Sequence, residues 1–330
     1  MKNNNASHSH PLLSPLLNGD RQALSRSISL LESQLDSHRL EANILMGNIL
    51  SHTGKSIRVA ISGVPGVGKS SFIEALGLLL TGMGKKVGVL TIDPSSKQSG
   101  GSILGDKTRM TQLSSTELAY IRTTPAASSL GGVAQNTRGS IKLCEAAGFE
   151  VILIETVGVG QNELEVHEMV DFFLLLNLPG AGDEIQGIKR GIMEVADALL
   201  INKADGDAVP LAKKAQQYFK AALHAFQSRE NGWSPPVLLA SATEGTGIVE
   251  IWQQIETFVA LQQKSGDFER NRQQQEISGW KSQMTESLKR AFFKDPTVKA
   301  LLLQLELEIT RGDATAVQAT QRAIDTFRKA

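Results

Sequence analysis

A glycine-rich run that ends in lysine and serine is the part of this chain best suited to chemistry. The run reads Gly63-Val64-Pro65-Gly66-Val67-Gly68-Lys69-Ser70 and fits the pattern G-x-x-x-x-G-K-[ST]. A β-branched segment over 57–61 precedes it and a helical pattern over 71–80 follows, so a tight turn would aim backbone N–H groups and a helix start at one anion. This spacing predicts a phosphate-binding loop, with Lys69 at the β- and γ-phosphates and Ser70 on Mg²⁺. The predicted nucleotide-binding residues of the loop are Gly63, Gly66, Val67, Gly68, Lys69, Ser70 and Ser71.

A second motif, Asn202-Lys203-Ala204-Asp205, resembles the N-K-x-D guanine-specificity motif of GTPases. Asp205 would accept hydrogen bonds from the guanine N1–H and exocyclic amine, which adenine does not present in that arrangement. Asn202 would bond the base N7, and the stem of Lys203 would cover the ring. The alternative is that Asp205 only caps a helix start. Because a buried carboxylate without its donors is costly, such a site would select GTP over ATP.

Ser241-Ala242 follows the apolar run 237–240 and resembles the last guanine-contacting loop of GTPases. Backbone N–H groups there would meet the base O6. We therefore predict that Ser241 and Ala242 complete the base site.

Several carboxylates could serve the phosphate end of the site. Glu155 and Gly158 follow the apolar run 151–154 and stand where GTPases have D-x-x-G, whose acid orients a Mg²⁺-bound water and whose glycine N–H meets the γ-phosphate. Asp93 and Asp106 are candidates for the same Mg²⁺ network, since this ion keeps several waters and takes few protein ligands. The alternative for both aspartates is a turn residue.

The position after Gly158 predicts slow intrinsic hydrolysis. Ras-like GTPases place there a glutamine that orients the attacking water, whereas this chain has Val159. Another residue or a partner would then position the water. Nearby, Glu163 and His167 lie one helical turn apart and are predicted to form a solvated pair rather than a metal site.

Composition indicates a soluble globular protein that has no net positive charge to attract a polyanion such as nucleic acid. The 330 residues are 41% hydrophobic, and 34 basic residues balance 34 acidic ones, so we expect neither nucleic acid nor a membrane as partner. Cys144 is the single cysteine, which excludes an intramolecular disulfide and fits a reducing compartment. The first residues lack a continuous apolar segment, and no run approaches the roughly 20 apolar residues that span a bilayer. We expect a cytoplasmic protein.

Short apolar runs alternate with longer amphipathic segments from residue 57 onward, which predicts a doubly wound α/β domain with a mostly parallel sheet. Each polar motif follows one of these runs, and ligands of such sheets bind at the carboxyl ends of the strands. The predicted strands lie at 57–61, 87–92, 119–122, 151–154, 172–176, 198–201 and 237–240. The predicted organisation is a disordered lead (1–18), a helical extension (19–54), a P-loop GTPase domain (55–264) and a helical appendage (265–330).

Longer segments carry a resemblance to a known family. The stretches 93–96, 100–110, 155–161 and 179–189 closely resemble the MeaB/ArgK GTPases. That resemblance implies a GTP-hydrolysing chaperone of an adenosylcobalamin-dependent acyl-CoA mutase, usually methylmalonyl-CoA mutase, that gates cobalamin loading and guards the mutase from inactivation. It also implies a homodimer, with the region beyond 265 contributing to the dimer contact, and a cobalamin adenosyltransferase as a further candidate partner.

The resemblance also assigns residues. It implies that Asp93, Asp106 and Glu155 form the magnesium and switch network, and that Arg109 lies on the phosphate side. It makes the loop 179–190 a further switch that reports nucleotide state to the mutase. The residues so implied are Lys69, Asp106, Arg109, Glu155 and Gly158 for catalysis, and Asp183, Glu184, Gln186 and Lys189 for the switch.

Other functions stay open at this point. A nickel-delivering GTPase would share the core, but its His-rich or Cys-containing metal sites have no counterpart here, since His8 and His10 stand in the lead and the other histidines are scattered. A transport-associated ATPase or kinase would need ATP, which the motif at 202–205 disfavours. A scaffold that binds GTP without turnover is the third alternative.

Overall fold

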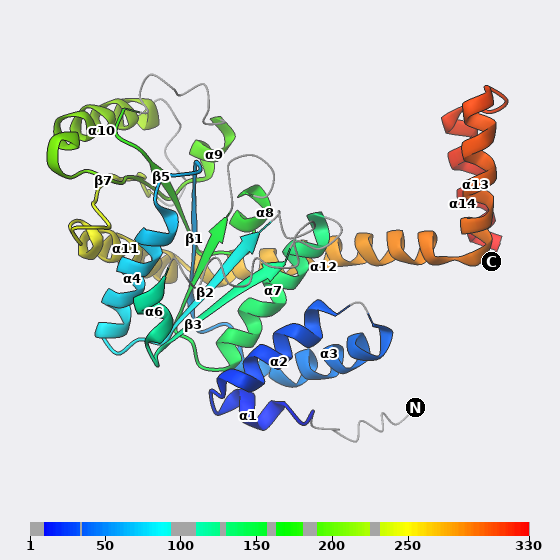
Figure 1. Ribbon diagram of the computed structural model, residues 1–330, viewed down its shortest axis with the longest axis horizontal. Helices are drawn as coiled ribbons and strands as arrows, with labels where there is room; N and C mark the ends of the chain where they lie inside the picture. Colours follow the sequence, from blue (N-terminus) through cyan, green and yellow to red (C-terminus); the bar gives the residue numbers. More distant parts are fainter. Residues whose placement is uncertain are drawn as a thin grey trace. The chain divides into compact units, whose positions relative to one another are not determined.

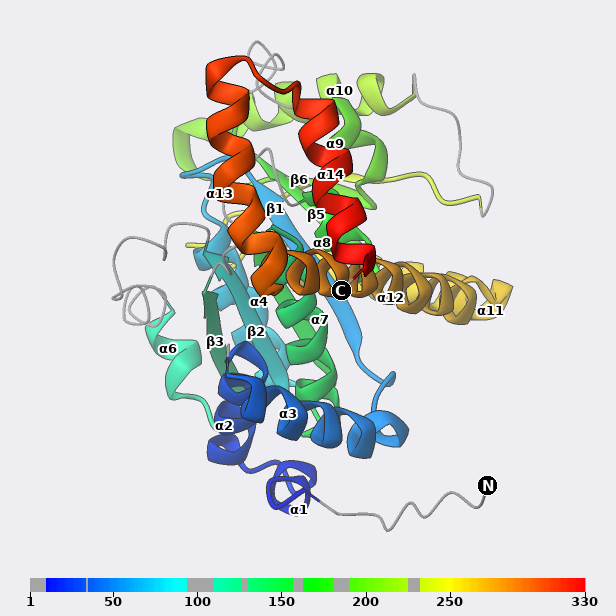
Figure 2. The ribbon, with the colours of Figure 1, turned by 90° about the vertical axis from the view of Figure 1, so that its right-hand side faces the viewer.

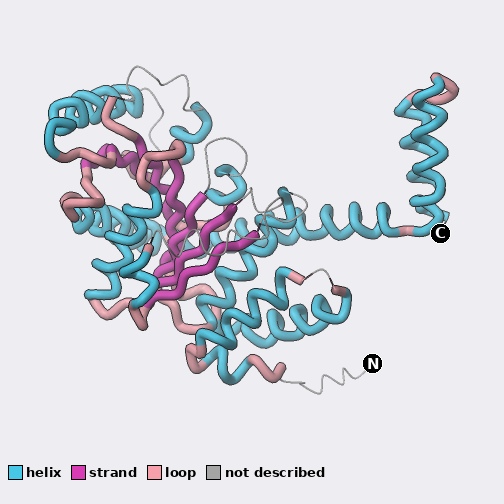
Figure 3. Tube along the Cα trace, in the orientation of Figure 1, coloured by secondary structure: helices cyan, strands magenta, loops and turns pink. Residues whose placement is uncertain are grey.

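Seven parallel strands form the centre of the fold (Figure 3). The computed structural model describes residues 10–33, 35–93, 110–125, 130–156, 163–180, 190–224 and 232–329. The strands are β1 (Ile57–Gly63), β2 (Val87–Asp93), β3 (Ala119–Pro125), β4 (Val151–Thr156), β5 (Phe172–Asn177), β6 (Ala198–Ile201) and β7 (Val237–Leu239), in the order β3-β2-β4-β1-β5-β6-β7. The predicted parallel sheet is confirmed, and β1 and β4 lie at its centre.

Helices cover both faces of the sheet because both faces are apolar (Figure 1). Along β4, Val151 and Leu153 belong to one core, and Ile152 and Ile154 belong to the other. The helices of the first core are α4 (Lys69–Gly82), α6 (Thr111–Ser115) and α11 (Ile248–Ser265); those of the second are α2 (Arg21–Glu32), α3 (Asp36–Ile49), α7 (Leu130–Ala146), α8 (Glu163–His167), α9 (Arg190–Val195) and α10 (Val209–His224). Figure 2 shows the hairpin of α2 and α3 beside α7, so this N-terminal hairpin is part of the domain's packing.

The chain is ordered earlier than the sequence predicts. A short helix, α1 (Leu13–Leu17), precedes α2, and Leu16 is fully buried in the core shared with α2 and α7. Asp20 then caps α2 by accepting hydrogen bonds from the backbone N–H groups of Gln22 (2.7 Å) and Ala23 (2.9 Å). The prediction of disorder over 1–18 is therefore wrong for residues 10–18, because apolar pairs too short for a strong sequence signal share one buried face. Residues 1–9 lie outside the described part.

The C-terminal residues Ile277–Ala330 form a second compact unit. The long helix α12 (Asp267–Lys294) enters it, and α13 (Pro296–Arg311) and α14 (Ala316–Lys329) pack on each other through Leu305 and Ala323. Asp295 ends α12 and caps α13 by accepting from Thr297 N and Val298 N, with Pro296 in the first helical position. This unit is all helical in its described residues.

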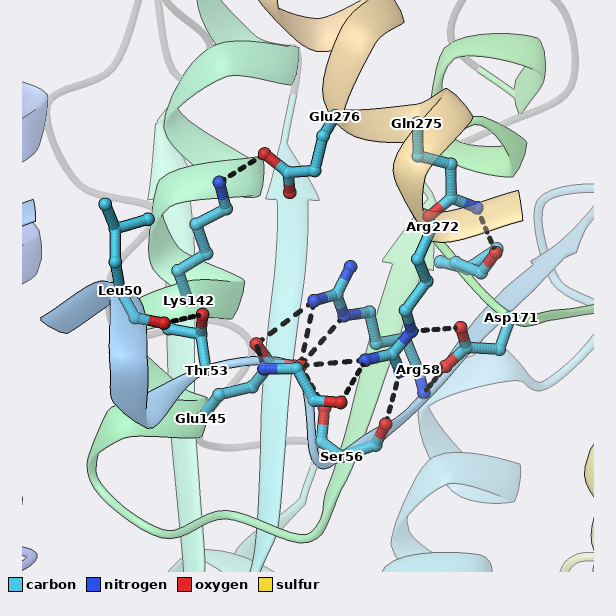
Figure 4. Close-up of polar contacts among 12 residues, drawn as sticks. Leu50, Thr53, Ser56, Arg58, Lys142, Glu145, Asp171, Arg272, Gln275 and Glu276 are labelled. Atoms are coloured by element: carbon cyan, nitrogen blue, oxygen red, sulfur yellow. Dashed lines mark hydrogen bonds and ion pairs between the residues drawn. The ribbon is translucent and has the colours of Figure 1, made fainter. Parts of the chain in front are cut away.

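A buried group of charges, which we call the basal cluster, lies at the amino ends of β1 and β5 (Figure 4). It consists of Arg58, Glu145, Asp171 and Arg272. Arg58 forms a bidentate pair with Glu145, Nε to Oε1 and Nη2 to Oε2, both at 3.0 Å. Burial alone would raise the pKa of the Glu145 carboxyl, but Arg58, the Ser56 hydroxyl and the Gly54 N–H together lower it overall.

The Glu145 pair makes a pH-dependent contribution to stability. Glu145→Gln leaves Arg58 buried without its counter-charge, so we expect a loss of about 3–5 kcal/mol in the free energy of unfolding at pH 7, measured by urea denaturation. Since the folded pKa is depressed, this stabilisation is complete above the ordinary glutamate value of 4.5 and disappears as pH falls through the folded pKa. The difference between wild type and variant should therefore shrink in acid.

The exposed carboxylate of Glu117 provides the matched control. Glu117→Gln should change stability by less than about 0.5 kcal/mol. An equal loss in both variants, or a loss for Glu145→Gln that grows in acid, would contradict the role given to the pair.

Candidate functional site

The phosphate-loop sequence lies between β1 and α4, where only glycine fits at two positions. Gly63 has φ 152°, and a Cβ there would lie 2.5 Å from the carbonyl oxygen of Leu176 on β5. Gly68 has φ 92°, and a Cβ there would lie 2.7 Å from Nδ2 of Asn202. The loop is thus packed directly against the ends of two other strands, and any side chain at these glycines would push it away.

Lys69 opens α4 and is buried under the loop. Its Nζ donates to the carbonyl oxygens of Gly63 (2.8 Å) and Val64 (3.3 Å), and the residue is 8% exposed. Burial lowers the pKa of the Lys69 ammonium, while the carboxylates of Glu155 and Glu163 act in the opposite direction. The loop therefore holds one buried positive charge, which suits a phosphate group.

Ser70 and Glu155 bring two hard oxygens together on neighbouring elements. The Ser70 hydroxyl on α4 donates to Oε1 of Glu155 at the end of β4, at 3.1 Å. Two ligands at about 2.1 Å from one Mg²⁺ and at a right angle to each other lie roughly 3.0 Å apart, so this pair fits adjacent ligands of that ion. Asp93 ends β2, the strand that pairs with β4 in parallel, so its backbone lies at the same edge of the sheet. Ser71 is exposed in the first turn of α4.

Asn202 joins the phosphate loop to the base motif. Its side chain is 1% exposed, and Nδ2 donates to the carbonyl oxygen of Val67 at 2.9 Å. Its Oδ1 accepts from the N–H of Ala242 at 3.4 Å, which ties in the loop after β7. Lys203 adds a second link, Nζ to the carbonyl oxygen of Gly66 at 2.9 Å. Three segments far apart in sequence are thereby held in one edge of the sheet.

Lys203 has a left-handed backbone, with φ 57°, which is rare for a residue other than glycine. Such conformations cost about 1–3 kcal/mol and persist where the surroundings impose them. Here the bonds of Asn202 on one side and of the Lys203 ammonium on the other hold the turn.

Asp205 belongs to the base motif and does not cap a helix. Its side chain makes no capping bond to the short 3₁₀ helix Gly206–Ala208 that follows. It instead accepts a short hydrogen bond from the hydroxyl of Ser241, which is itself fully buried. The structure therefore removes the capping alternative and places the carboxylate beside the Ser241-Ala242 loop.

Several predicted site residues lie outside the described residues, and their roles stay predictions. For Asp93 the backbone is described and the side chain is not. The residues outside are Asp106, Arg109, Gly158, Val159, Asp183, Glu184, Gln186 and Lys189.

Glu163 differs from its sequence prediction. It was expected in a solvated pair with His167, yet it is 4% exposed at the start of α8, and its charge acts on Lys69. The sequence signal that could have indicated a place near the phosphate end is the position of Glu163, a few residues after the D-x-x-G-like element. Among the described residues, no three His, Cys, Asp or Glu side chains gather into a candidate metal site.

The family comparison decides what kind of protein carries this site. A family model described as "Methylmalonyl Co-A mutase-associated GTPase MeaB" matches residues 24–297. The chain belongs to the MeaB family. As a member it is a P-loop GTPase, and the expected GTPase activity and family resemblance are both confirmed.

Relatives of this MeaB-family GTPase cover most of its length. The chain is 45% identical to GTPase ArgK of Escherichia coli over 271 residues, 82% of each chain. It is 40% identical to the mitochondrial methylmalonic aciduria type A homolog of Mus musculus over 327 residues, covering 96% of this chain and 79% of that one. A solved structure titled "Crystal structure of LAO/AO transport system kinase" superimposes with a TM-score of 0.75 at 33% identity, over 99% of both chains.

The base site predicts a change of nucleotide preference. In Asp205→Asn the carboxylate that would accept from the guanine N1–H and amine becomes an amide, so GTP affinity should fall by about tenfold to a hundredfold and xanthosine triphosphate should bind better than GTP. Competition against a fluorescent GDP analogue measures both affinities.

Asp207→Asn, two residues along and exposed, is the control and should leave the order of nucleotides unchanged. If Asp205→Asn kept guanine selectivity, the assignment of the base site would be wrong.

Proposed function

We propose that this GTPase is a nucleotide-gated chaperone of an adenosylcobalamin-dependent acyl-CoA mutase, with methylmalonyl-CoA mutase as the client. The observation that carries the proposal is the match of residues 24–297 to a family described by its association with that mutase. In this role the chain gates loading of the cobalamin cofactor, protects the mutase, and has a cobalamin adenosyltransferase as a further partner. Its GTP site is the switch that times these events.

Residues of several motifs divide the work at the switch. Lys69 neutralises phosphate charge, while Ser70 and Glu155 hold Mg²⁺, with Asp93 and Asp106 as further members of the network. Bound Mg²⁺ would neutralise charge on the phosphates and order their oxygens. The base contacts come from Asn202, Lys203, Asp205, Ser241 and Ala242. With Val159 in the usual glutamine position, hydrolysis alone is slow, and the nucleotide state lasts long enough to be read by a partner.

A transport-associated kinase is the alternative that a structural relative suggests by its title. The arrangement around Asp205 argues for guanine instead, because the carboxylate lies with Ser241 beside the loop that Asn202 joins to the phosphate loop. The nickel-delivery alternative finds no support in the described residues, which gather no metal-binding cluster.

The C-terminal unit supports a homodimer. On α12, Ile277, Trp280, Met284 and Leu288 follow one another at three- and four-residue steps, and each is between 45% and 60% exposed. Large apolar side chains repeated on one helix face mark an association surface. We propose that a second copy of the chain covers this stripe, as the family resemblance implies.

We propose a cytoplasmic location together with the client. Cys144 on α7 carries a free, buried thiol, and burial raises the pKa of that thiol. The thiol is therefore unreactive, and the fold does not require an oxidising compartment. None of the described helices combines the length and the apolar character needed to cross a lipid bilayer.

The chaperone proposal predicts nucleotide-dependent binding to the mutase. Calorimetric titration of purified methylmalonyl-CoA mutase should give affinities for the GTP-analogue and GDP forms that differ by about fivefold or more, since coupling free energies are typically 1–3 kcal/mol. In Lys189→Ala, within the charged 179–190 segment, GTP affinity should stay unchanged while mutase-stimulated hydrolysis falls. Equal mutase affinity in both nucleotide states, or no complex in either, would sink the proposal.

The dimer predicts a mass change. Light scattering should give wild type twice the chain mass of 35.5 kDa, and the double variant Trp280→Glu with Leu288→Glu should run at the mass of one chain, because charge on the stripe opposes its burial. Gln283→Glu, an exposed polar neighbour on α12, is the control and should stay dimeric. A wild-type chain of single mass would refute this part of the proposal.

A further inference from the structure

The first turns of α12 are built into the GTPase unit by the basal cluster. Arg272 donates from Nη1 to the carbonyl oxygen of Gly54 (2.7 Å) and from Nη2 to that of Ser56 (2.5 Å). It also forms a bidentate pair with Asp171, at 2.8 and 2.6 Å, and its guanidinium lies 4.4 Å from the centre of the Phe268 ring. Figure 4 shows Ser56 and Asp171 beside Arg272, and these contacts fix the start of α12 to the amino ends of β1 and β5.

A second link joins α12 to α7 and to the residue that follows α8. Arg138 on α7 donates from one nitrogen, Nη1, to the carbonyl oxygens of both Glu168 (2.8 Å) and Gln275 (3.2 Å). Glu168 directly follows α8, and Gln275 lies on α12. The Gln275 side chain also donates to the carbonyl oxygen of Val170 at 2.7 Å. The segment between α8 and β5 is therefore bonded to α12 through Arg138 and Gln275.

Helix α8 also contacts β1, the strand whose last residue, Gly63, begins the phosphate loop. Glu163 opens the helix, is buried, and acts electrostatically on Lys69. A helix over Glu163–His167 is only about 7 Å long at 1.5 Å per residue. Val166 anchors this short element in the core, so a displacement of one end of the helix also displaces the other. A shift at Glu163 is therefore felt at Glu168 and at the bond to Arg138.

We propose that Arg138 couples the phosphate end of the site to α12, so that the root of the C-terminal helix responds to the bound nucleotide. This rests on the proposed function, in which GTP and GDP place the site in different states. Residues 267–276 are the part of α12 that would read that difference, and the helix continues from there into the C-terminal unit.

A neighbouring contact separates coupling from simple anchoring. Lys142 lies one turn along α7 and pairs with Glu276 on α12, Nζ to Oε2 at 2.6 Å. Like Arg138 it holds α12 to α7. Its partner Glu276 lies on α12, whereas Arg138 also bonds Glu168 beside α8. Loss of Lys142 therefore weakens the attachment of α12 and spares the bond to α8.

Hydrogen exchange of the full chain, read by mass spectrometry, tests the coupling. In wild type, peptides covering 267–276 should exchange at rates that differ by about fivefold between the GDP and GTP-analogue forms, as expected for a coupling of roughly 1 kcal/mol. In Arg138→Met, which keeps the apolar stem, most of that difference should disappear, while affinities for both nucleotides stay within about threefold of wild type. In Lys142→Met the difference should remain.

Three results would overturn the proposal. The first is that Arg138→Met keeps the full difference in exchange rate between the two nucleotide forms. The second is that Lys142→Met loses as much of that difference as Arg138→Met. The third is that residues 267–276 of the wild type exchange at the same rate in both forms. Should Arg138→Met fail to fold, as a thermal melt would show, Arg138→Lys keeps the charge but lacks the planar guanidinium, and the same outcomes apply to it.

The experiment contains no mutase, so the coupling proposal would stand even if the mutase proved not to be the client. If peptides at Gly63–Ser70 and Glu163–His167 respond to the nucleotide and 267–276 does not, only the coupling fails. If no peptide responds, the nucleotide switch of the proposed function fails as well.

Discussion

The buried amide of Asn202 is the contact on which the candidate site depends. Its two polar ends bind different loops, the Val67 carbonyl of the phosphate loop and the Ala242 N–H of the loop after β7. An amide is one of the few side chains that donates and accepts at once, and at 1% exposure an unmet bond would be costly. The separation of the phosphate loop from the loop after β7, which we propose contacts the base, is thereby set before a nucleotide binds.

The parallel sheet gives the molecule two chemically different edges. At the carboxyl edge lie the phosphate loop, the Ser70–Glu155 pair and the base motif. At the amino edge lies the basal cluster, where two arginines and two carboxylates are matched with each other and with backbone groups. The second edge holds the root of α12 through Arg272. The short helix α8 belongs to the connection that runs from the carboxyl end of β4 to the amino end of β5.

Much of the fold could be predicted from sequence because its signals are local. Each strand is a short apolar run, and the motifs follow the runs directly, so the sheet and the edge that carries the site required no knowledge of packing. The guanine motif and the phosphate loop were likewise visible as fixed spacings. What the sequence missed depends on contacts between distant segments: the burial of Leu16 of α1 in the core with α2 and α7, the burial of Glu163 at the start of α8, and the bond from Ser241 to Asp205. The bridge of Arg138 between Glu168 and Gln275 uses backbone carbonyls, which leave no mark on sequence at all.

Selectivity for guanine is the central claim, because the switch, the client and the coupling to α12 all depend on it. Calorimetric titration of the wild-type chain with GTP and with ATP, each with Mg²⁺, tests it most directly. The linked carboxylate and amide site predicts that GTP binds on the order of a hundredfold or more tightly than ATP, since a site built for hydrogen-bond donors rejects a base that lacks them. Equal affinity for the two nucleotides would contradict the base site and everything built on it.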